Sequence, residues 1–169
     1  MWEKTGFIVL GAVIGWFLQQ YRVARSEDIA LVNEHIKDIE KFCDAAQAYW
    51  LKTPATPEED IALAAKVRAT HSATTLLYPD IGKLCENRQS EYKFHTFDLF
   101  NAATGGQFEG HDRTLDAPRA IEIGDASARL VHLLRSNRVY IVSMKRFWKA
   151  LVDAIYFKIS TYGGDKNHF

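Results

Sequence analysis

Hydrophobic positions along the chain follow two patterns, and the first covers the opening residues. Residues 6–18 (GFIVLGAVIGWFL) carry no charge and are apolar on every side of a helix, so they lack the one-sided stripe of a helix in a globular core. Trp2, Trp16 and Tyr21 lie near the two ends of this run, where membrane helices place amphipathic rings. A helix from Trp2 to Tyr21 rises about 30 Å, enough for a bilayer core. The pattern predicts a transmembrane anchor over residues 1–22.

A secretory signal peptide is the alternative for an apolar run of this length. The sequence after Leu18 reads QQYR and contains no small-residue cleavage motif, which favours an uncleaved anchor. Basic residues set the direction of insertion, since Lys4 precedes the run whereas Arg22, Arg25 and Lys37 follow it. This bias predicts a single-pass protein of the plasma (inner) membrane with its C-terminal domain in the cytoplasm.

Two glycines in the apolar run are spaced four residues apart. Gly11 and Gly15 form a G-x-x-x-G motif, which lets two membrane helices approach closely and gain packing contacts. The competing interpretation is that glycine is simply common in membrane helices. We expect self-association through the Gly11 and Gly15 face, and hence a homo-oligomer or another protein partner.

The second pattern is a repeat of apolar residues at steps of three and four, typical of a helix that buries one face. It first runs through Ile29, Val32, Ile36, Ile39, Cys43, Ala46 and Trp50. No Gly or Pro interrupts residues 16–52, so this helix is able to grow directly out of the anchor. Ser26, followed by Glu27 and Asp28, offers an alternative helix start and would imply a break there.

Helix signals recur along the rest of the chain. Thr56-Pro57-Glu58-Glu59 has the form of a capped helix start with a capping box, and Asp116 with Pro118 opens a later helix. Between them a helix is expected from about Pro79 to Ala103. Its expected inward positions are Ile81, Leu84, Cys85, Tyr92, Leu99 and Ala102, with Phe94, Phe97 and Phe100 widening that face. Ser136-Asn137 is a weak break before a last helix that contains Ile141, Met144, Trp148, Leu151, Ile155 and Ile159.

No segment alternates as a strand would. The fold class expected is therefore all-α: one N-terminal transmembrane helix followed by a cytoplasmic bundle of four or five helices. The bundle domain should occupy residues 23–162, and residues 163–169 should form a flexible tail.

The long connection over residues 104–113 gathers glycines with side chains able to bind a ligand. Those candidates are Glu109, His111, Asp112 and Arg113, and Glu109 or His111 is also able to act in acid–base chemistry. They support an alternative function as an enzyme or small-ligand sensor. The competing interpretation is a surface loop whose glycines end one helix and whose charges face water.

Composition fits one globular domain, and Lys+Arg and Asp+Glu both total 21, so no overall charge favours nucleic acid. The charge is uneven, however, because residues 1–117 have a net charge of −5 and residues 118–169 a net charge of +5. Arg138, Lys145, Arg146 and Lys149 could form a basic face that contacts lipid headgroups or, less expected, nucleic acid. Attraction between the two oppositely charged halves of the bundle is the competing explanation.

Metal and cofactor sites are not expected. His35 with Asp38 and His95 with Asp98 are spaced like metal ligands on helices, with Glu91 one turn before His95. The apolar seam nevertheless directs His35 and Asp38 towards a polar flank. Metalloprotease, P-loop, dinucleotide-binding and serine-hydrolase motifs are all absent from the sequence, which argues against an enzyme.

The two cysteines, Cys43 and Cys85, lie at inward helical positions, where a free thiol packs as a small apolar side chain. Together these patterns predict a membrane-tethered helical module for protein interaction or scaffolding that self-associates.

Overall fold

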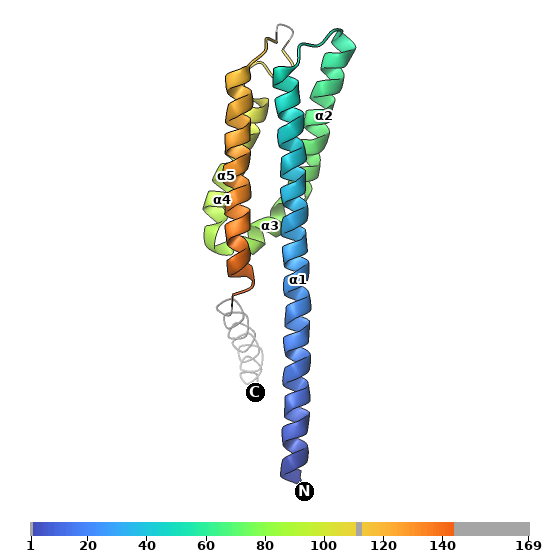
Figure 1. The fold of residues 1–169 in the computed structure, drawn as a ribbon, viewed down its shortest axis with the longest axis vertical. Helices are drawn as coiled ribbons and strands as arrows, with labels where there is room; N and C mark the ends of the chain where they lie inside the picture. The colour runs from blue at the N-terminus through green and yellow to red at the C-terminus, as the bar shows by residue number, and fades with distance from the viewer. Residues whose placement is uncertain (1, 111–112, 144–169) are drawn as a thin grey trace, which may run out of the picture.

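A computed structural model describes residues 2–110 and 113–143, and every regular element in these two ranges is helical, as predicted. The elements are α1 (Trp2–Leu51), α2 (Pro57–Leu76), α3 (Tyr78–Leu84), the 3₁₀ turn η1 (Glu86–Arg88), α4 (Gln89–Thr104) and α5 (Ala117–Ile141). The other helices lie along the second half of α1, whose first half projects beyond them (Figure 1). The expected last helix and the expected tail 163–169 lie outside the described residues.

Within the described ranges, no helix contains a stretch that is both long enough and apolar enough to cross a membrane. The membrane-spanning part of the predicted fold therefore gains no support from the structure.

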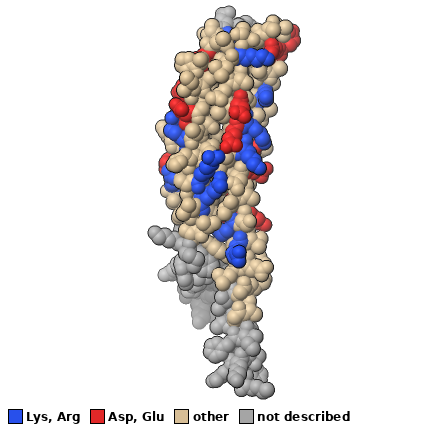
Figure 2. Space-filling model, in the orientation of Figure 1, with Lys and Arg blue, Asp and Glu red and all other residues tan. Residues whose placement is uncertain are grey.

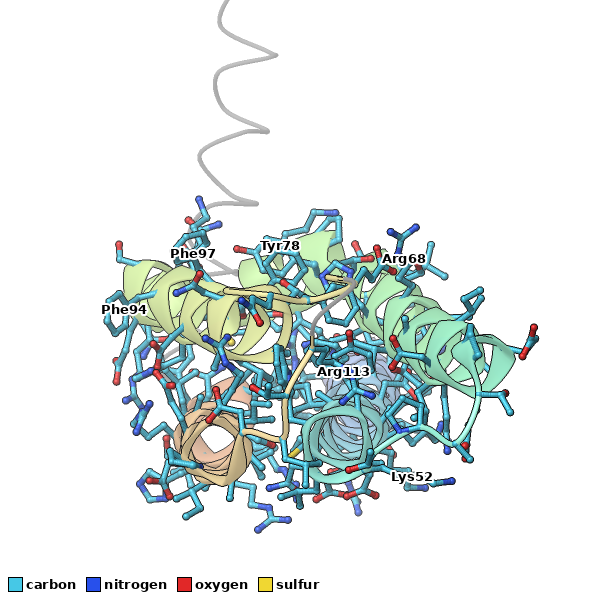
Figure 3. The ribbon with its side chains drawn as sticks, turned by 90° about the horizontal axis from the view of Figure 1, so that it is seen from above. Lys52, Arg68, Tyr78, Phe94, Phe97 and Arg113 are labelled. Carbon is cyan, nitrogen blue, oxygen red and sulfur yellow. The ribbon has the colours of Figure 1, made fainter. Side chains whose placement is uncertain are left out.

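Helix α1 is continuous for 50 residues, so the alternative break at Ser26 does not occur. Its apolar seam is buried as predicted from Val32 on: Val32, Ile36, Ile39, Cys43, Ala46 and Trp50 are all at most 9% exposed. Ile29, where the predicted seam begins, is only partly buried. This seam packs mainly against α2 and α5, and α4 packs mainly against α5. Seen along the bundle in Figure 3, α1 and α5 lie side by side, with α2 beyond α1 and α4 beyond α5.

Two side-chain hydrogen bonds fix the end of the bundle that lies away from the projecting half of α1. The indole Nε1 of Trp50 donates to the carbonyl oxygen of Ala103 at 2.8 Å, which joins α1 to α4. The amide of Gln47 donates to the carbonyl oxygen of Ala120 at 2.9 Å, which joins α1 to α5. Both bonds use side chains one turn apart on α1, so the register of α1 against its neighbours is set twice.

The two helix starts read from the sequence are confirmed. The hydroxyl of Thr56 accepts a hydrogen bond from the Glu59 backbone N–H at 3.3 Å, and the Asp116 carboxylate accepts one from Arg119 N–H at 2.9 Å. Each bond satisfies a donor that the first turn of a helix leaves unpaired.

The single helix expected from Pro79 to Ala103 is wrong, because α3 ends at Leu84 and α4 starts at Gln89. The expected break at Ser136-Asn137 is also wrong, since α5 continues to Ile141. One side chain links the two positions. Asn137 is buried, and its amide donates to the Leu84 carbonyl at 2.9 Å, so it satisfies the end of α3 instead of ending its own helix.

The aromatic face of α4 also differs from the prediction. Phe94 and Phe97 are 64% and 68% exposed, and Phe100 is 38% exposed. The buried stripe of α4 runs through Tyr92 and Leu99, and Phe94 lies about 200° around the helix from Tyr92 at 100° per residue. Figure 3 accordingly shows Phe94 and Phe97 pointing away from the bundle.

Candidate functional site

The projecting half of α1 carries the predicted self-association face. Gly11 and Gly15 are exposed, and a Cβ atom added at either would meet nothing within 4 Å. Trp16 on the same segment is 58% exposed and Leu18 is 49% exposed. The segment ends where the hydroxyl of Tyr21 lies 3.5 Å from the Ser143 carbonyl oxygen and donates to it. Both glycines therefore lie on a surface that no described part of the bundle covers.

The opposite end of the molecule holds the predicted loop, and Arg113 fastens it to the bundle. This side chain is only 3% exposed and lies between α1 and α2 (Figure 3). Its guanidinium donates to Asp60 Oδ1 at 2.5 and 2.9 Å, to the Tyr49 carbonyl at 2.5 Å and to the Lys52 carbonyl at 3.1 Å. It also lies 4.2 Å from the centre of the Tyr49 ring. Arg113 thus closes the end of α1 against the first turn of α2.

Glu109 lies on the same loop with an unusual backbone. Its φ of 61° is the only positive value among the described residues other than glycine. Its backbone N–H donates to the hydroxyl of Tyr49 at 2.8 Å, and its carboxylate pairs with the guanidinium of Arg68. The next residue, Gly110, donates its N–H to the Gln107 carbonyl at 2.9 Å. The loop is therefore held in a tight turn that presents Glu109 to α2.

Glu109 and Arg68 form part of the wall of a cleft of about 810 Å³. The turn before α2, the first three turns of α2 and the Glu109 turn surround this space. Its described walls combine small apolar side chains with Asp60, Arg68 and Glu109. Asp60 and Arg68 were not among the residues predicted from the sequence. Each lies more than forty positions from its partner on the loop, and no sequence motif connects residues so far apart.

Several predicted binding residues are not placed. His111 and Asp112 of the loop, and Lys145, Arg146 and Lys149 of the expected basic face, lie outside the described residues. Arg138, the remaining member of that face, is half-buried near the end of α5. Elsewhere on α5, Arg129 pairs with Asp98 at 2.7 Å and Arg135 with Glu40 at 3.4 Å, and both signs of charge are interspersed on the face shown in Figure 2.

The expected position of His35 is wrong. The side chain is fully buried instead of lying on a polar flank, and its Nε2 lies 2.8 Å from the hydroxyl of Tyr92. Burial lowers the pKa of His35 to about 4, against a smaller opposite effect of the nearby Asp38 carboxylate. A neutral imidazole at physiological pH joins α1 to α4 as part of the core.

The spacing pairs considered as metal ligands do not converge. Within residues 2–110 and 113–143, no three His, Cys, Asp or Glu side chains are grouped so as to hold a metal ion. Asp38 pairs with Lys41 at 2.8 Å, Glu91 with Arg88 at 2.5 Å and Asp98 with Arg129 at 2.7 Å. Their carboxylates thus take part in ordinary ion pairs along helix surfaces.

Cys43 and Cys85 are both buried free thiols. The pKa of the Cys43 thiol is raised, mainly because the side chain is buried. A raised pKa leaves less of the reactive thiolate, so Cys43 acts as a packing residue.

Comparison with protein-family models, with curated sequences and with solved structures finds no match for this chain. Its function has to be inferred from the placement of its own residues.

Proposed function

We propose that the chain is a membrane-tethered helical module for protein interaction, and that it pairs with a second copy through the projecting half of α1. The continuity of α1 carries this proposal, because one helix joins the apolar segment to the buried seam of the bundle without a hinge. At 1.5 Å per residue, α1 is about 75 Å long. A rigid helix of this length holds the bundle at a set distance and orientation from whatever its first turns bind.

The apolar run supports a membrane as the attachment site. Residues 6–18 alone are too short for a bilayer core, so spanning requires Trp2, Trp16 and Tyr21 at the headgroup level, with Glu3 and Lys4 reaching outwards. Arg22 and Arg25 lie within seven residues after the run. Their position favours a bundle on the cytoplasmic side of the plasma (inner) membrane.

Self-association follows from the spacing of Gly11 and Gly15. In lipid, helices attract each other mainly through close packing, and two glycines four residues apart allow a close approach. No described residue fills the space around either position, which supports pairing with another helix.

Fractionation of cells expressing the full-length chain tests the membrane attachment. A reporter is fused after Phe169. The fusion protein should stay in the membrane fraction after a carbonate wash. A reporter that is active only in the cytoplasm should give a signal in this fusion. A full-length protein released by carbonate, or one trimmed at its N-terminus and found in the supernatant, would contradict the proposed tether.

A membrane dimerisation assay tests the pairing surface. Gly11→Leu and Gly15→Leu should each weaken the dimer by on the order of 1 kcal/mol, because a side chain separates the two backbones. Val13→Leu is the matched control, since position 13 lies about 200° around the helix from Gly11. Equal dimer signals from all three variants would assign any self-association to another surface.

A further inference from the structure

The cleft lined by Arg68 and Glu109 has the composition of a binding site for a small amphipathic ligand. Its apolar wall is formed by Pro54, Ala55, Pro57, Ile61, Ala64 and Ala65. Ile61, on this wall, is 69% exposed. The cleft volume of about 810 Å³ lies within the range of small-molecule sites, which combine apolar walls with a few polar groups.

The charges of the cleft differ in how firmly they are held. Asp60 accepts two hydrogen bonds from Arg113, a side chain that is itself only 3% exposed. Arg68 is the only Lys or Arg among the described residues that line the cleft, and it is 68% exposed on α2. Figure 3 shows Arg68 at the outer edge of α2, away from the enclosed Arg113. Arg68 is therefore the cation of the cleft that is able to exchange its partner.

The partner that Arg68 has in this structure comes from a strained turn. Glu109 adopts the left-handed backbone that side-chain-bearing residues rarely take, and this conformation costs free energy. Strain of this kind is typical of ligand-binding segments. The Glu109 carboxylate is thus a partner of the Arg68 guanidinium that comes from within the chain, and both residues line the cleft.

We propose that this cleft binds a small organic acid, a carboxylate on an apolar body, and that the ligand carboxylate takes the place of Glu109 on Arg68. The exchange keeps one carboxylate on the guanidinium of Arg68, and the displaced carboxylate of Glu109 turns to solvent. The apolar body of the ligand lies against Ile61, Ala64 and the two prolines and removes them from water. Glu109 acts as an internal competitor that is displaced on binding.

Calorimetry on the full-length chain in detergent tests this site, with 4-phenylbutyrate as the probe and 4-phenylbutanamide as its neutral counterpart. Titrations into detergent alone correct for partitioning. The acid should bind at least about tenfold more tightly than the amide, because the neutral amide has one acceptor oxygen instead of two and carries no charge to pair with Arg68. Arg68→Gln should remove this preference, whereas Glu109→Gln should tighten binding of the acid by about two- to fivefold, as expected for loss of an exposed competing ion pair.

Arg129→Gln is the matched control, because Arg129 also forms an exposed ion pair, with Asp98, but lies outside the cleft. It should bind the acid as the wild-type chain does. Circular dichroism checks that every variant retains its helical content. Equal affinity for acid and amide, weaker binding in Glu109→Gln, or no binding of the acid at millimolar concentration would each overturn the proposal.

Discussion

The hydroxyl oxygen of Tyr92 lies 2.8 Å from Nε2 of His35, and both side chains are fully buried where α4 meets α1. Tyr78 stacks on the Tyr92 ring with a centroid distance of 5.2 Å, which encloses the pair from the side of α3. Burial raises the pKa of Tyr92 well above its usual value, so its hydroxyl stays protonated. This neutral hydrogen bond therefore joins α1 to α4, as the bond from Trp50 to Ala103 does nearer the other end of α4.

Tyr92→Phe should destabilise the fold by about 1–3 kcal/mol, because it leaves Nε2 of His35 buried without a partner. Denaturant unfolding of the full-length chain measures this loss. Tyr78→Phe is the control, since no described residue is hydrogen-bonded to the Tyr78 hydroxyl and the stacked ring is kept. This change should alter stability by less than about 0.5 kcal/mol. A similar loss in both variants would show that the His35 bond contributes nothing measurable.

The stability of the fold should fall as pH decreases from about 6.5 to about 4. The folded state lowers the pKa of His35 from 6.5 to about 4, mainly by burial, so in this window the unfolded chain binds a proton that the folded chain does not. Stability from this group is complete above pH 6.5 and is lost as pH falls to about 4. The full loss is on the order of 3 kcal/mol, at about 1.4 kcal/mol per pKa unit.

Thermal melting as a function of pH measures this effect. His35→Gln should flatten the dependence between pH 6.5 and 4, because the glutamine does not titrate. His132→Gln replaces an exposed histidine of α5 and should leave the wild-type dependence in place. A dependence that survives His35→Gln unchanged would assign it to other groups, namely the carboxylates and His71, whose pKa burial also lowers.

The contrast between His35 and its neighbours on α1 explains how far sequence reasoning reaches. The seam from Val32 to Trp50 was predictable because a period of three and four is a property of one helix. His35 directly precedes Ile36, and its burial depends on a tyrosine hydroxyl 57 residues away that supplies its hydrogen bond. No local pattern contains that partner, so the polar flank was the natural expectation.

Arg113→Ala should destabilise the fold by about 2–3 kcal/mol, because it leaves Asp60 and two backbone carbonyls without their donor. Arg113→Lys should recover only part of this loss, since an ammonium group cannot reproduce the planar fork that reaches all three partners. Denaturant unfolding compares both variants. Arg129→Ala, which removes an exposed pair, should cost less than about 1 kcal/mol. An equal cost at Arg113 and Arg129 would exclude the proposed fastening role.

Arg113 and Glu109 show which part of the candidate site was predictable from the sequence. The loop stood out by its glycines and charged residues, and the structure does place Glu109 at the cleft. The charges alone did not distinguish a buried fastening residue from an exposed binding residue. That difference comes from Asp60 and Arg68 on α2, which lie 53 and 41 positions from their partners on the loop.

Glu109 gives a prediction that separates backbone strain from charge. Glu109→Gly and Glu109→Ala both remove the ion pair with Arg68, so they differ mainly in how the residue tolerates a φ of 61°. Glycine adopts the left-handed region without a steric penalty, whereas alanine pays the same steric penalty as glutamate. The glycine variant should therefore be more stable than the alanine variant by about 1 kcal/mol in denaturant unfolding. Gly106, whose φ is 68°, provides the converse test, because Gly106→Ala should destabilise the same loop. Alanine and glycine variants of equal stability at position 109 would mean that this backbone stores no strain for a ligand to release.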